Sequence, residues 1–548
     1  MTSAIYYSKD AFRINKNKAL GRQVAGNDFL EAYCKYTNYS NFWVYARTRD
    51  EANDFAKFSI DNGIKRNIRF INFENTLALK EPGLLFFPGP DVAELSRHRS
   101  FFASNAWSIC GVTHTTSSKR IMKSIESIVT SPLESWDALI CTSKSVKSNI
   151  TTIIETTENN LRIKLGAKTF VRPQLPVIPL GIDTSKFNYQ EKDKINSRAK
   201  FGIQSDEIVV LYLGRLSFHA KANPYPMYKA LEKTHHDTQK KIVLIECGWY
   251  ANNEIKEAFI QAAECFCPSI RLLRVDGNDN EVKNCSLAAA DIFCSLSDNI
   301  QETFGITPIE AMASGLPCVV SDWNGYKDTI RHEIDGFRIQ SLMPNEGLGN
   351  DLALRYSLGI DSYDMYIGHA SNLISIDIDQ TTLAFTKLIS NKNLRNKMGD
   401  NARKRCQNEY DWKTIINKYT DLWKNLHEIR NDSSNKLSNY KSADSIDPFL
   451  SFSSYPSKIL SEDKIISIKK NNYIDFSEKI KKLKKLYMIN YASYVIPDEN
   501  FLKKLLTDIH HNKKSLHELK KCYQDINYAY FIRAILWLHK FDFIIISD

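Results

Sequence analysis

Short apolar segments alternate with amphipathic helical stretches from residue 1 to about residue 430, and this alternation limits the fold more than any other feature of the chain. Apolar runs of this length, separated by helices, are typical of buried strands in a parallel sheet. The first series of expected strands comprises Ala4–Tyr7, Phe42–Ala46, Ile68–Asn72, Leu84–Phe87, Trp107–Val112, Ala138–Thr142 and Val177–Pro179. The second series comprises Ile208–Leu213, Ile242–Glu246, Ile270–Val275, Asp291–Ser295, Pro317–Ser321 and Phe337–Ile339.

The charged stretch Tyr189–Lys200 separates the two series and indicates a linker. Two consecutive series predict an α/β fold with two doubly wound, Rossmann-like domains that face a cleft, over residues 1–195 and 196–410. Ligands of such folds bind outside the carboxyl ends of the strands. The loops that directly follow the strands are therefore where functional residues are expected.

The C-terminal part of the chain has a different pattern. We expect a linker and a basic helical segment over 431–498, followed by a winged-helix-like helical module over 499–548. Its third helix, Ile526–His539, is largely apolar, whereas a helix that reads DNA needs polar and basic side chains. Protein docking or packing within the chain is favoured over nucleic-acid binding for this module.

Charge and cysteine content exclude several classes of protein. The 548 residues carry 73 Lys and Arg against 63 Asp and Glu, a net charge of +10 that is too dilute to indicate nucleic acid. The eleven cysteines are scattered, which argues against a disulfide framework or a zinc site. No apolar run is long enough to span a membrane and no secretory signal is visible, so we expect a cytoplasmic protein. Peripheral contact with the inner face of a membrane, through the basic residues of 118–123, stays open.

The segment Ser295–Ser321 predicts a strand, a loop and a helix. Thr307 suits the N-cap of this helix, and a helix N-terminus that points into a cleft is a ready phosphate site. Glu302 in the loop and Glu310 in the helix are suited to accept hydrogen bonds from vicinal hydroxyls. Taken alone, however, the spacing of Thr307 and Glu310 also fits a capping box.

A second cluster follows the strand Ile208–Leu213. Gly214 and Arg215 end this strand, and Lys221 lies in the next loop. A guanidinium and an ammonium group at a strand end are suited to hold a diphosphate and to stabilise the charge that it gains on leaving.

Together these motifs resemble the GT-B glycosyltransferases, specifically the large retaining family 4 (glycosyl transferases group 1). The resemblance lies in two glutamates separated by seven residues, with Phe304 and Gly305 after the first and a small-residue helix that ends at Gly315. It implies that Glu302 contacts the donor sugar and that Glu310 binds the ribose hydroxyls of the nucleotide. It also implies that the backbone at Phe304 and Gly305 faces the sugar and the phosphates, beside Thr307 and Gly214.

The resemblance also implies roles outside this segment. Arg215 and Lys221 would stabilise the departing diphosphate, although Lys221 stands six residues after the arginine where five is usual. His114, at the end of the strand Trp107–Val112, would reach the donor sugar. Gly26, in a glycine-rich loop that opens a helix, would approach donor or acceptor, with Arg22 as a weaker candidate. The first domain would hold the acceptor, the second the nucleotide sugar, and a helix over 411–430 would cross back to the first domain.

The function expected from this resemblance is transfer of a sugar from a nucleotide-sugar donor, such as a UDP- or GDP-sugar, to an acceptor hydroxyl with retention of configuration. The acceptor would be a glycan or a lipid-linked molecule in surface polysaccharide or glycolipid synthesis. No Asp-x-Asp motif ends an apolar strand, so neither metal nor other cofactor is expected. Two alternatives stay open: a phosphorylase or epimerase of the same fold, and an inactive transferase-like scaffold that works through its C-terminal module.

Overall fold

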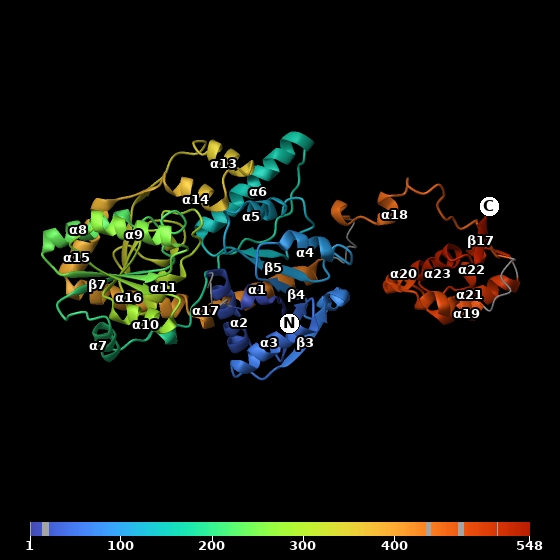
Figure 1. Cartoon of the computed structure of the whole chain (residues 1–548), viewed down its shortest axis with the longest axis horizontal. Coiled ribbons are helices and arrows are strands. Elements are labelled where there is room, and N and C mark those ends of the chain that lie inside the picture. Colours follow the sequence, from blue (N-terminus) through green and yellow to red (C-terminus); the bar gives the residue numbers. More distant parts are fainter. Residues whose placement is uncertain (1, 14–20, 434–439, 470–475, 512) are drawn as a thin grey trace. The chain divides into compact units, whose positions relative to one another are not determined.

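The computed structural model describes residues 2–13, 21–433, 440–469, 476–511 and 513–548. The chain divides into two compact units, Met1–Lys441 and Ser442–Asp548 (Figure 1). The first unit holds two α/β domains, so the fold class expected from the sequence is confirmed.

The first α/β domain is built on a six-stranded sheet with the order β3-β2-β1-β4-β5-β6, and all of its pairings are parallel. Its strands are β1 (Ala4–Tyr6), β2 (Asn41–Ala46), β3 (Asn67–Asn72), β4 (Leu84–Phe87), β5 (Ser108–Val112) and β6 (Ala138–Ile140). This is the strand order of a doubly wound dinucleotide-binding fold. The strand expected at Val177–Pro179 is reduced to a single bridge between Cys141 and Val177. Prolines on both sides of it lack the N–H groups that a ladder needs.

The second domain repeats this topology. Its six-stranded parallel sheet has the order β12-β11-β10-β7-β8-β9. The strands are β7 (Ile208–Leu213), β8 (Ile242–Gly248), β9 (Arg271–Asp276), β10 (Ile292–Ser295), β11 (Cys318–Ser321) and β12 (Gly336–Ile339). The apolar runs of the second series therefore predicted all six strands to within two residues at either end.

Helices flank both sheets (Figure 1). Those of the first domain are α1 (Lys9–Phe12), α2 (Gly21–Tyr36), α3 (Arg49–Asp61), η1 (Phe73–Lys80), α4 (Val92–Arg99), α5 (Lys119–Glu126) and α6 (Lys144–Leu165). Between the domains and in the second domain lie η2 (Thr184–Phe187), α7 (Glu191–Lys200), α8 (Tyr225–Thr238), α9 (Asn253–Phe266), α10 (Asn280–Ala289), α11 (Ile306–Ala313), α12 (Tyr326–Thr329), α15 (Ile378–Ser390) and α16 (Lys392–Glu409).

The charged stretch expected to be a linker is mostly helix α7. This helix packs against α10, and its Lys194 and Arg198 form ion pairs with Asp291 at 2.7 and 3.1 Å. Because these cations face a carboxylate of the second domain, α7 is part of that domain. The second domain thus begins before the expected boundary at residue 196.

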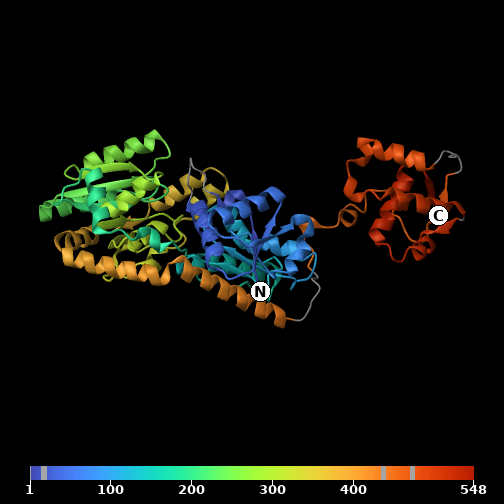
Figure 2. The ribbon, with the colours of Figure 1, turned by 90° about the horizontal axis from the view of Figure 1, so that it is seen from below.

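The long helix α17 (Trp412–Asp432) returns to the first domain (Figure 2). Its entry is fixed by two backbone hydrogen bonds, from Ile182 N to Tyr410 O at 2.9 Å and from Trp412 N to Ile182 O at 3.0 Å. Trp423 of α17 is buried against Tyr33 and Phe86 of the first domain. The helix thereby completes the core of a domain whose other elements lie far earlier in the sequence.

An insertion of the second domain follows β12. It consists of β13 (Ser341–Leu342), α13 (Asn350–Ser357), α14 (Tyr363–Ser371) and β14 (Ser375–Ile376). The Tyr363 hydroxyl lies 2.8 Å from Ser117 Oγ, and the backbone N–H of Lys119 donates to the Tyr356 hydroxyl at 2.9 Å. The insertion therefore joins the second domain to the loop that follows β5 in the first.

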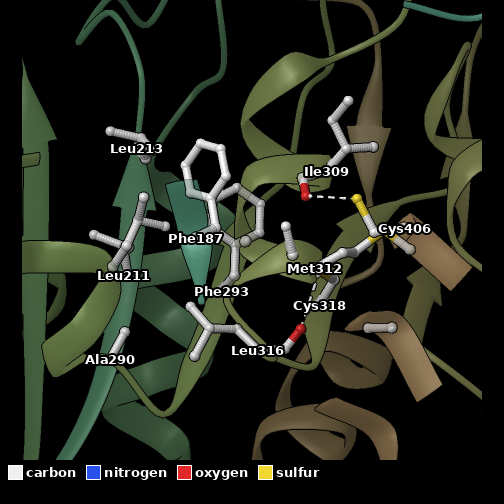
Figure 3. Close-up of a cluster of buried hydrophobic side chains, with 14 of the residues drawn as sticks. Phe187, Leu211, Leu213, Ala290, Phe293, Ile309, Met312, Leu316, Cys318 and Cys406 are labelled. Carbon is white, nitrogen blue, oxygen red and sulfur yellow. Dashed lines mark hydrogen bonds between the residues drawn. The ribbon is translucent and has the colours of Figure 1, made fainter. Parts of the chain in front are cut away.

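The core of the second domain fixes the position of α11 (Figure 3). Ile309 and Met312 of α11 pack with Leu211 and Phe293 of the sheet. On the other side, Cys406 Sγ of α16 donates to the Ile309 carbonyl at 3.4 Å. All eleven cysteines of the chain are described, and all are free.

The C-terminal unit contains a three-stranded antiparallel sheet with the order β16-β15-β17. Its elements are η3 (Ala443–Ser445), α18 (Pro448–Ser451), β15 (Ile465–Ile468), α19 (Phe476–Lys485), α20 (Tyr487–Asn490), η4 (Ser493–Val495), α21 (Glu499–His511), β16 (Lys514–Ser515), α22 (Leu516–Cys522), α23 (Tyr528–Lys540) and β17 (Ile544–Ser547). The expected boundary at residue 499 is too late, because β15 is the central strand and Ile466 and Ile480 are buried in the unit's core. Within the described ranges of the whole chain, no helix has the length and apolar character needed to cross a membrane.

Candidate functional site

A cavity of about 560 Å³ lies between the two α/β domains, at the carboxyl ends of strands β7, β8 and β10. Most of its wall belongs to the second domain, and the first domain contributes residues such as Val24 and His114. Nine of the ten site residues expected from the sequence line it: His114, Gly214, Arg215, Lys221, Glu302, Phe304, Gly305, Thr307 and Glu310. The structure therefore brings motifs that are up to about 200 residues apart in sequence into one cavity.

The exception is Gly26. It lies inside helix α2 rather than in a loop, and a Cβ at this position would stand 2.2 Å from the Ala11 carbonyl oxygen. The glycine is needed there because α2 packs closely on α1. Val24 and Ala25 of the same helix line the cavity instead. The side chain of Arg22 lies outside the part of the chain that the structure describes.

Helix α11 begins differently from the expectation. Its N-cap is Gly305, with φ of 87°, and Ile306 is the first helical residue, so Thr307 is not the N-cap. A side chain at Gly305 would be strained at this φ, and its Cβ would stand 2.2 Å from Tyr326 Cε1. Because no side chain caps the helix, its first N–H groups have no partner from a capping residue and border the cavity. The buried Thr307 Oγ1 also has no hydrogen-bond partner among the described residues.

Glu302 is held by one cation and by hydrogen-bond donors. Its Oε2 forms an ion pair with Lys221 Nζ, and its Oε1 accepts from the backbone N–H of Thr303 at 3.2 Å. Burial raises the pKa of Glu302, but Lys221 and these N–H donors outweigh burial and hold the pKa below its usual value. The carboxylate therefore stays charged and fixed in the cavity wall.

Arg215 is placed by the loop that contains the unusual spacing. Its Nη2 donates to the Ala220 carbonyl at 2.9 Å and to Gln301 Oε1 at 3.4 Å. The backbone N–H of Lys221 closes the same loop by donating to the Ser217 carbonyl at 3.0 Å. The additional residue is thus taken up in a turn, and Lys221 still reaches Glu302. Because both of these partners of Arg215 are neutral, its positive charge is available to an anion in the cavity.

Glu310 pairs with a residue that the sequence motifs did not indicate. Its Oε1 lies 2.7 Å from Lys283 Nζ of α10, and its Oε2 is buried with no hydrogen-bond partner among the described residues. The capping-box alternative is therefore not realised. Burial lowers the pKa of Lys283, but the carboxylate of Glu310 outweighs it, so the pKa lies above its usual value. One oxygen of Glu310 is left to accept a hydrogen bond from a ligand.

His114 follows strand β5 and lies at the junction of the domains. Its side chain lines the cavity, and its carbonyl accepts a hydrogen bond from Thr303 Oγ1 at 3.1 Å. Thr303 is the residue next to Glu302. The loop that carries Glu302 is thus tied to the first domain at the position of His114.

A second cavity of about 870 Å³ continues beyond Glu310 and shares Val24, Lys283 and Glu310 with the first. Asp28 of α2 faces it from the first domain. Burial raises the pKa of Asp28 to about 6, with a further increase from the negative charge of Glu310. The charges of Asp28, Lys283 and Glu310 therefore act on one another across the boundary between the domains.

The sequence could have indicated Lys283 only indirectly. A buried carboxylate such as Glu310 needs a cationic partner, but lysines are frequent in this chain and none stands at a diagnostic spacing from Glu310. In the described residues, no three His, Cys, Asp or Glu side chains are grouped as metal ligands would be.

Part of the chain matches a known protein family and known proteins. Residues 193–345 match the family model of glycosyl transferases group 1. An uncharacterized glycosyltransferase of Methanocaldococcus jannaschii is 24% identical over 296 residues, which cover 53% of this chain and 60% of that protein. The D-inositol 3-phosphate glycosyltransferase of Nocardia farcinica is 26% identical over 171 residues, 31% of this chain and 37% of that protein. The chain thus matches less than two thirds of the length of either curated relative.

Solved structures with a similar arrangement include sucrose-phosphate synthase from Thermosynechococcus elongatus, at 15% identity and a TM-score of 0.48, covering 78% of this chain and 100% of that one. Anabaena HepE in complex with UDP and glucose has 14% identity and a TM-score of 0.47, covering 77% of this chain and 98% of that one. The family match spans the part of the chain that carries Arg215, Lys221, Glu302 and Glu310. Residues 193–345 are thus similar to glycosyl transferases group 1.

Proposed function

We propose that this chain transfers a sugar from a nucleotide-sugar donor to an acceptor hydroxyl with retention of anomeric configuration. The observation that carries the proposal is the convergence of four features on one cavity: Arg215, Lys221, the uncapped N-terminus of α11 and the unpartnered oxygen of Glu310, as the described residues have them. Two cations and a helix N-terminus suit a diphosphate, and a carboxylate nearby suits a sugar or ribose diol.

The diphosphate would lie between Arg215 and the start of α11. Arg215 donates to neutral oxygens of Ala220 and Gln301, which leave its charge to an anion, and the N–H groups at Ile306 and Thr307 offer donors in a fixed position. Donors that are already in place before the reaction stabilise developing charge without reorganisation. Lys221 would be shared between Glu302 and the phosphate that leaves.

The two glutamates would bind opposite ends of the donor. Glu310, held by Lys283, would accept from the ribose hydroxyls through its free Oε2. Glu302, fixed by Lys221 and two backbone N–H groups, would accept from hydroxyls of the sugar. His114 would contact the same sugar from the first domain.

In the proposed reaction, the bond between the anomeric carbon and the phosphate oxygen breaks, and the acceptor oxygen bonds to the same face of that carbon. The proton of the acceptor hydroxyl passes to the departing phosphate oxygen. Arg215 and Lys221 stabilise the negative charge of the leaving diphosphate, so the transfer is proposed to need no metal ion. The products would belong to surface polysaccharide or glycolipid synthesis.

The test is incubation of the full chain with a panel of UDP- and GDP-sugars, with and without glycan and lipid-linked acceptors, and mass spectrometry of the products. Glu310→Ala is expected to weaken donor binding, and Arg215→Ala to lower turnover. Lys233→Ala, which removes an exposed ion pair with Asp379 outside the cavity, is the matched control and should leave both unchanged. Stabilisation by a nucleotide sugar without product would instead favour the scaffold alternative.

A further inference from the structure

The C-terminal unit carries a surface in which lysines and large exposed apolar side chains are adjacent. Helix α19 has lysine at five of its ten positions. It is followed directly by α20 (Figure 1) and then by η4, and Tyr487, Tyr491 and Tyr494 lie in or between these two elements. We call this the lysine–tyrosine surface, and its exposed members are Lys481, Lys482, Lys485, Leu486, Tyr487, Met488, Tyr491, Tyr494 and Val495.

This surface belongs to folded elements rather than to an irregular loop. Ile480 of α19 is fully buried and Ile489 of α20 is 9% exposed, and both belong to the core of the C-terminal unit. Helix α19 packs against α20 and α21. Because these isoleucines anchor one side of the segment, the lysines and tyrosines are held on the opposite, outward side.

The exposure of the apolar members is unusually high. Tyr487 is 85% exposed, Met488 77%, Tyr491 69% and Tyr494 88%. Large apolar side chains that are exposed within a few residues of one another on a folded protein are typical of an interaction site. Tyrosine is suited to a membrane interface in particular, because its ring prefers an apolar neighbour while its hydroxyl stays hydrated.

The charge of the surface identifies the partner. Lys481, Lys482 and Lys485 are exposed and directly precede the apolar side chains in the sequence. Glu478 is the one acidic residue of α19, and Glu499 of α21 is close enough to Lys481 for this lysine to help lower its pKa. Basic residues on one part of a surface helix beside apolar anchors are the pattern that binds anionic lipid. We propose that the lysine–tyrosine surface docks the chain on an anionic phospholipid bilayer.

A second group of exposed apolar residues allows a comparison, because it would also bind a bilayer if exposed apolar surface alone were sufficient. The insertion of the second domain exposes Leu342, Met343, Leu354 and Leu358 by 59% or more. Glu346 and Asp351 lie in the same insertion, and anionic lipid would repel them. We therefore expect the lysine–tyrosine surface, and not the insertion, to bind the bilayer.

The test is co-sedimentation of the full chain with vesicles of phosphatidylglycerol and phosphatidylcholine in equal parts, against vesicles of phosphatidylcholine alone. Binding is expected to the first and not to the second, and to weaken as salt is added. Lys481→Gln, Lys482→Gln and Lys485→Gln together should lower the affinity about a hundredfold, at about fivefold per lysine. Tyr487→Ser, Met488→Ser and Tyr491→Ser together should lower the sedimented fraction as well.

The matched control replaces Leu342, Met343 and Leu354 of the insertion with serine and should bind as the unaltered chain does. Circular dichroism and thermal unfolding of each variant verify that it is folded, which is expected because every altered side chain is exposed. Equal sedimentation with neutral vesicles, unchanged binding by both C-terminal variants, or binding to RNA but not to anionic vesicles would each overturn the proposal. The readout is independent of transferase activity, so it stands or fails separately from the proposed function.

Discussion

Replacing Lys283 with methionine tests the central electrostatic contact of the site. The change removes the cation that lies 2.7 Å from Glu310 Oε1 while keeping most of the side-chain volume. Breaking a buried ion pair by removing one partner costs about 3–5 kcal/mol, because the other charge is left buried and unpaired. The Glu310 side chain is 7% exposed and that of Lys283 is 23% exposed, so water screens part of the loss. We expect a decrease of about 2–3 kcal/mol in the free energy of unfolding.

The assay is urea unfolding followed by tryptophan fluorescence, made on a double-mutant cycle. Glu310→Gln should relieve the unpaired charge, so that Lys283→Met costs much less in a chain that already carries Glu310→Gln than in the unaltered chain. The double variant should nevertheless bind nucleotide sugar poorly, because it lacks the Glu310 carboxylate that is proposed to accept hydrogen bonds from the ribose. Lys233→Met is the control: its ion pair with Asp379 is exposed, and we expect a change below about 0.5 kcal/mol. An equal cost of Lys283→Met in both backgrounds would refute the reasoning.

Three further predictions concern the two cavities. Arg215→Lys should lower kcat by more than tenfold with little change in thermal unfolding, because an ammonium group cannot reproduce the guanidinium contacts to Ala220 and Gln301. A kcat equal to that of the unaltered chain would contradict the role of Arg215. Gly305→Ala should destabilise the chain and weaken donor binding, because φ is 87° at this position and Tyr326 occupies the space that a Cβ would need. Thermal unfolding and calorimetry measure these two effects. Gly347→Ala is the control: its φ is also positive but the space around it is open, so it should show the cost of backbone strain alone. Asp28 has a pKa of about 6 in the folded chain, whereas the ordinary value is 3.8. Unfolding at a pH between these two values therefore releases a proton from Asp28. Stability should fall as pH rises from about 4 to about 6, by up to about 3 kcal/mol, and Asp28→Asn should remove this dependence in urea unfolding at a series of pH values.

Buried parallel strands were the part of the fold most accessible from sequence. Runs such as Ile208–Leu213 are apolar on both faces because helices cover both sides of the sheet, so their position follows from composition alone. Residues near strand ends were equally accessible, since the carboxyl ends of parallel strands meet at one edge. This is why Arg215 and Glu302, although distant in sequence, line one cavity. His114 follows a strand of the other sheet and lines the same cavity because this cavity lies between the two domains.

The features of the site that could not be predicted from the sequence depend on tertiary contacts. Threonine at position 307 is a good N-cap by propensity, but the left-handed φ of Gly305 starts the helix earlier. The partner of Glu310 is Lys283 on a separate helix, and no local spacing relates the two. Gly26 was expected in a loop, yet it is required by the close packing of α2 on Ala11. In each case a long-range contact overrides a local preference.

Helix α17 also constrains how the chain reaches this fold during synthesis. Tyr33 and Phe86 are translated early, whereas Trp423, which packs against both, emerges from the ribosome hundreds of residues later. Until then the nascent first domain must carry an uncovered aromatic face, which invites chaperone capture or aggregation. A product that stops at residue 410 would lack this cover and should be recovered as insoluble protein, even though both sheets would be complete.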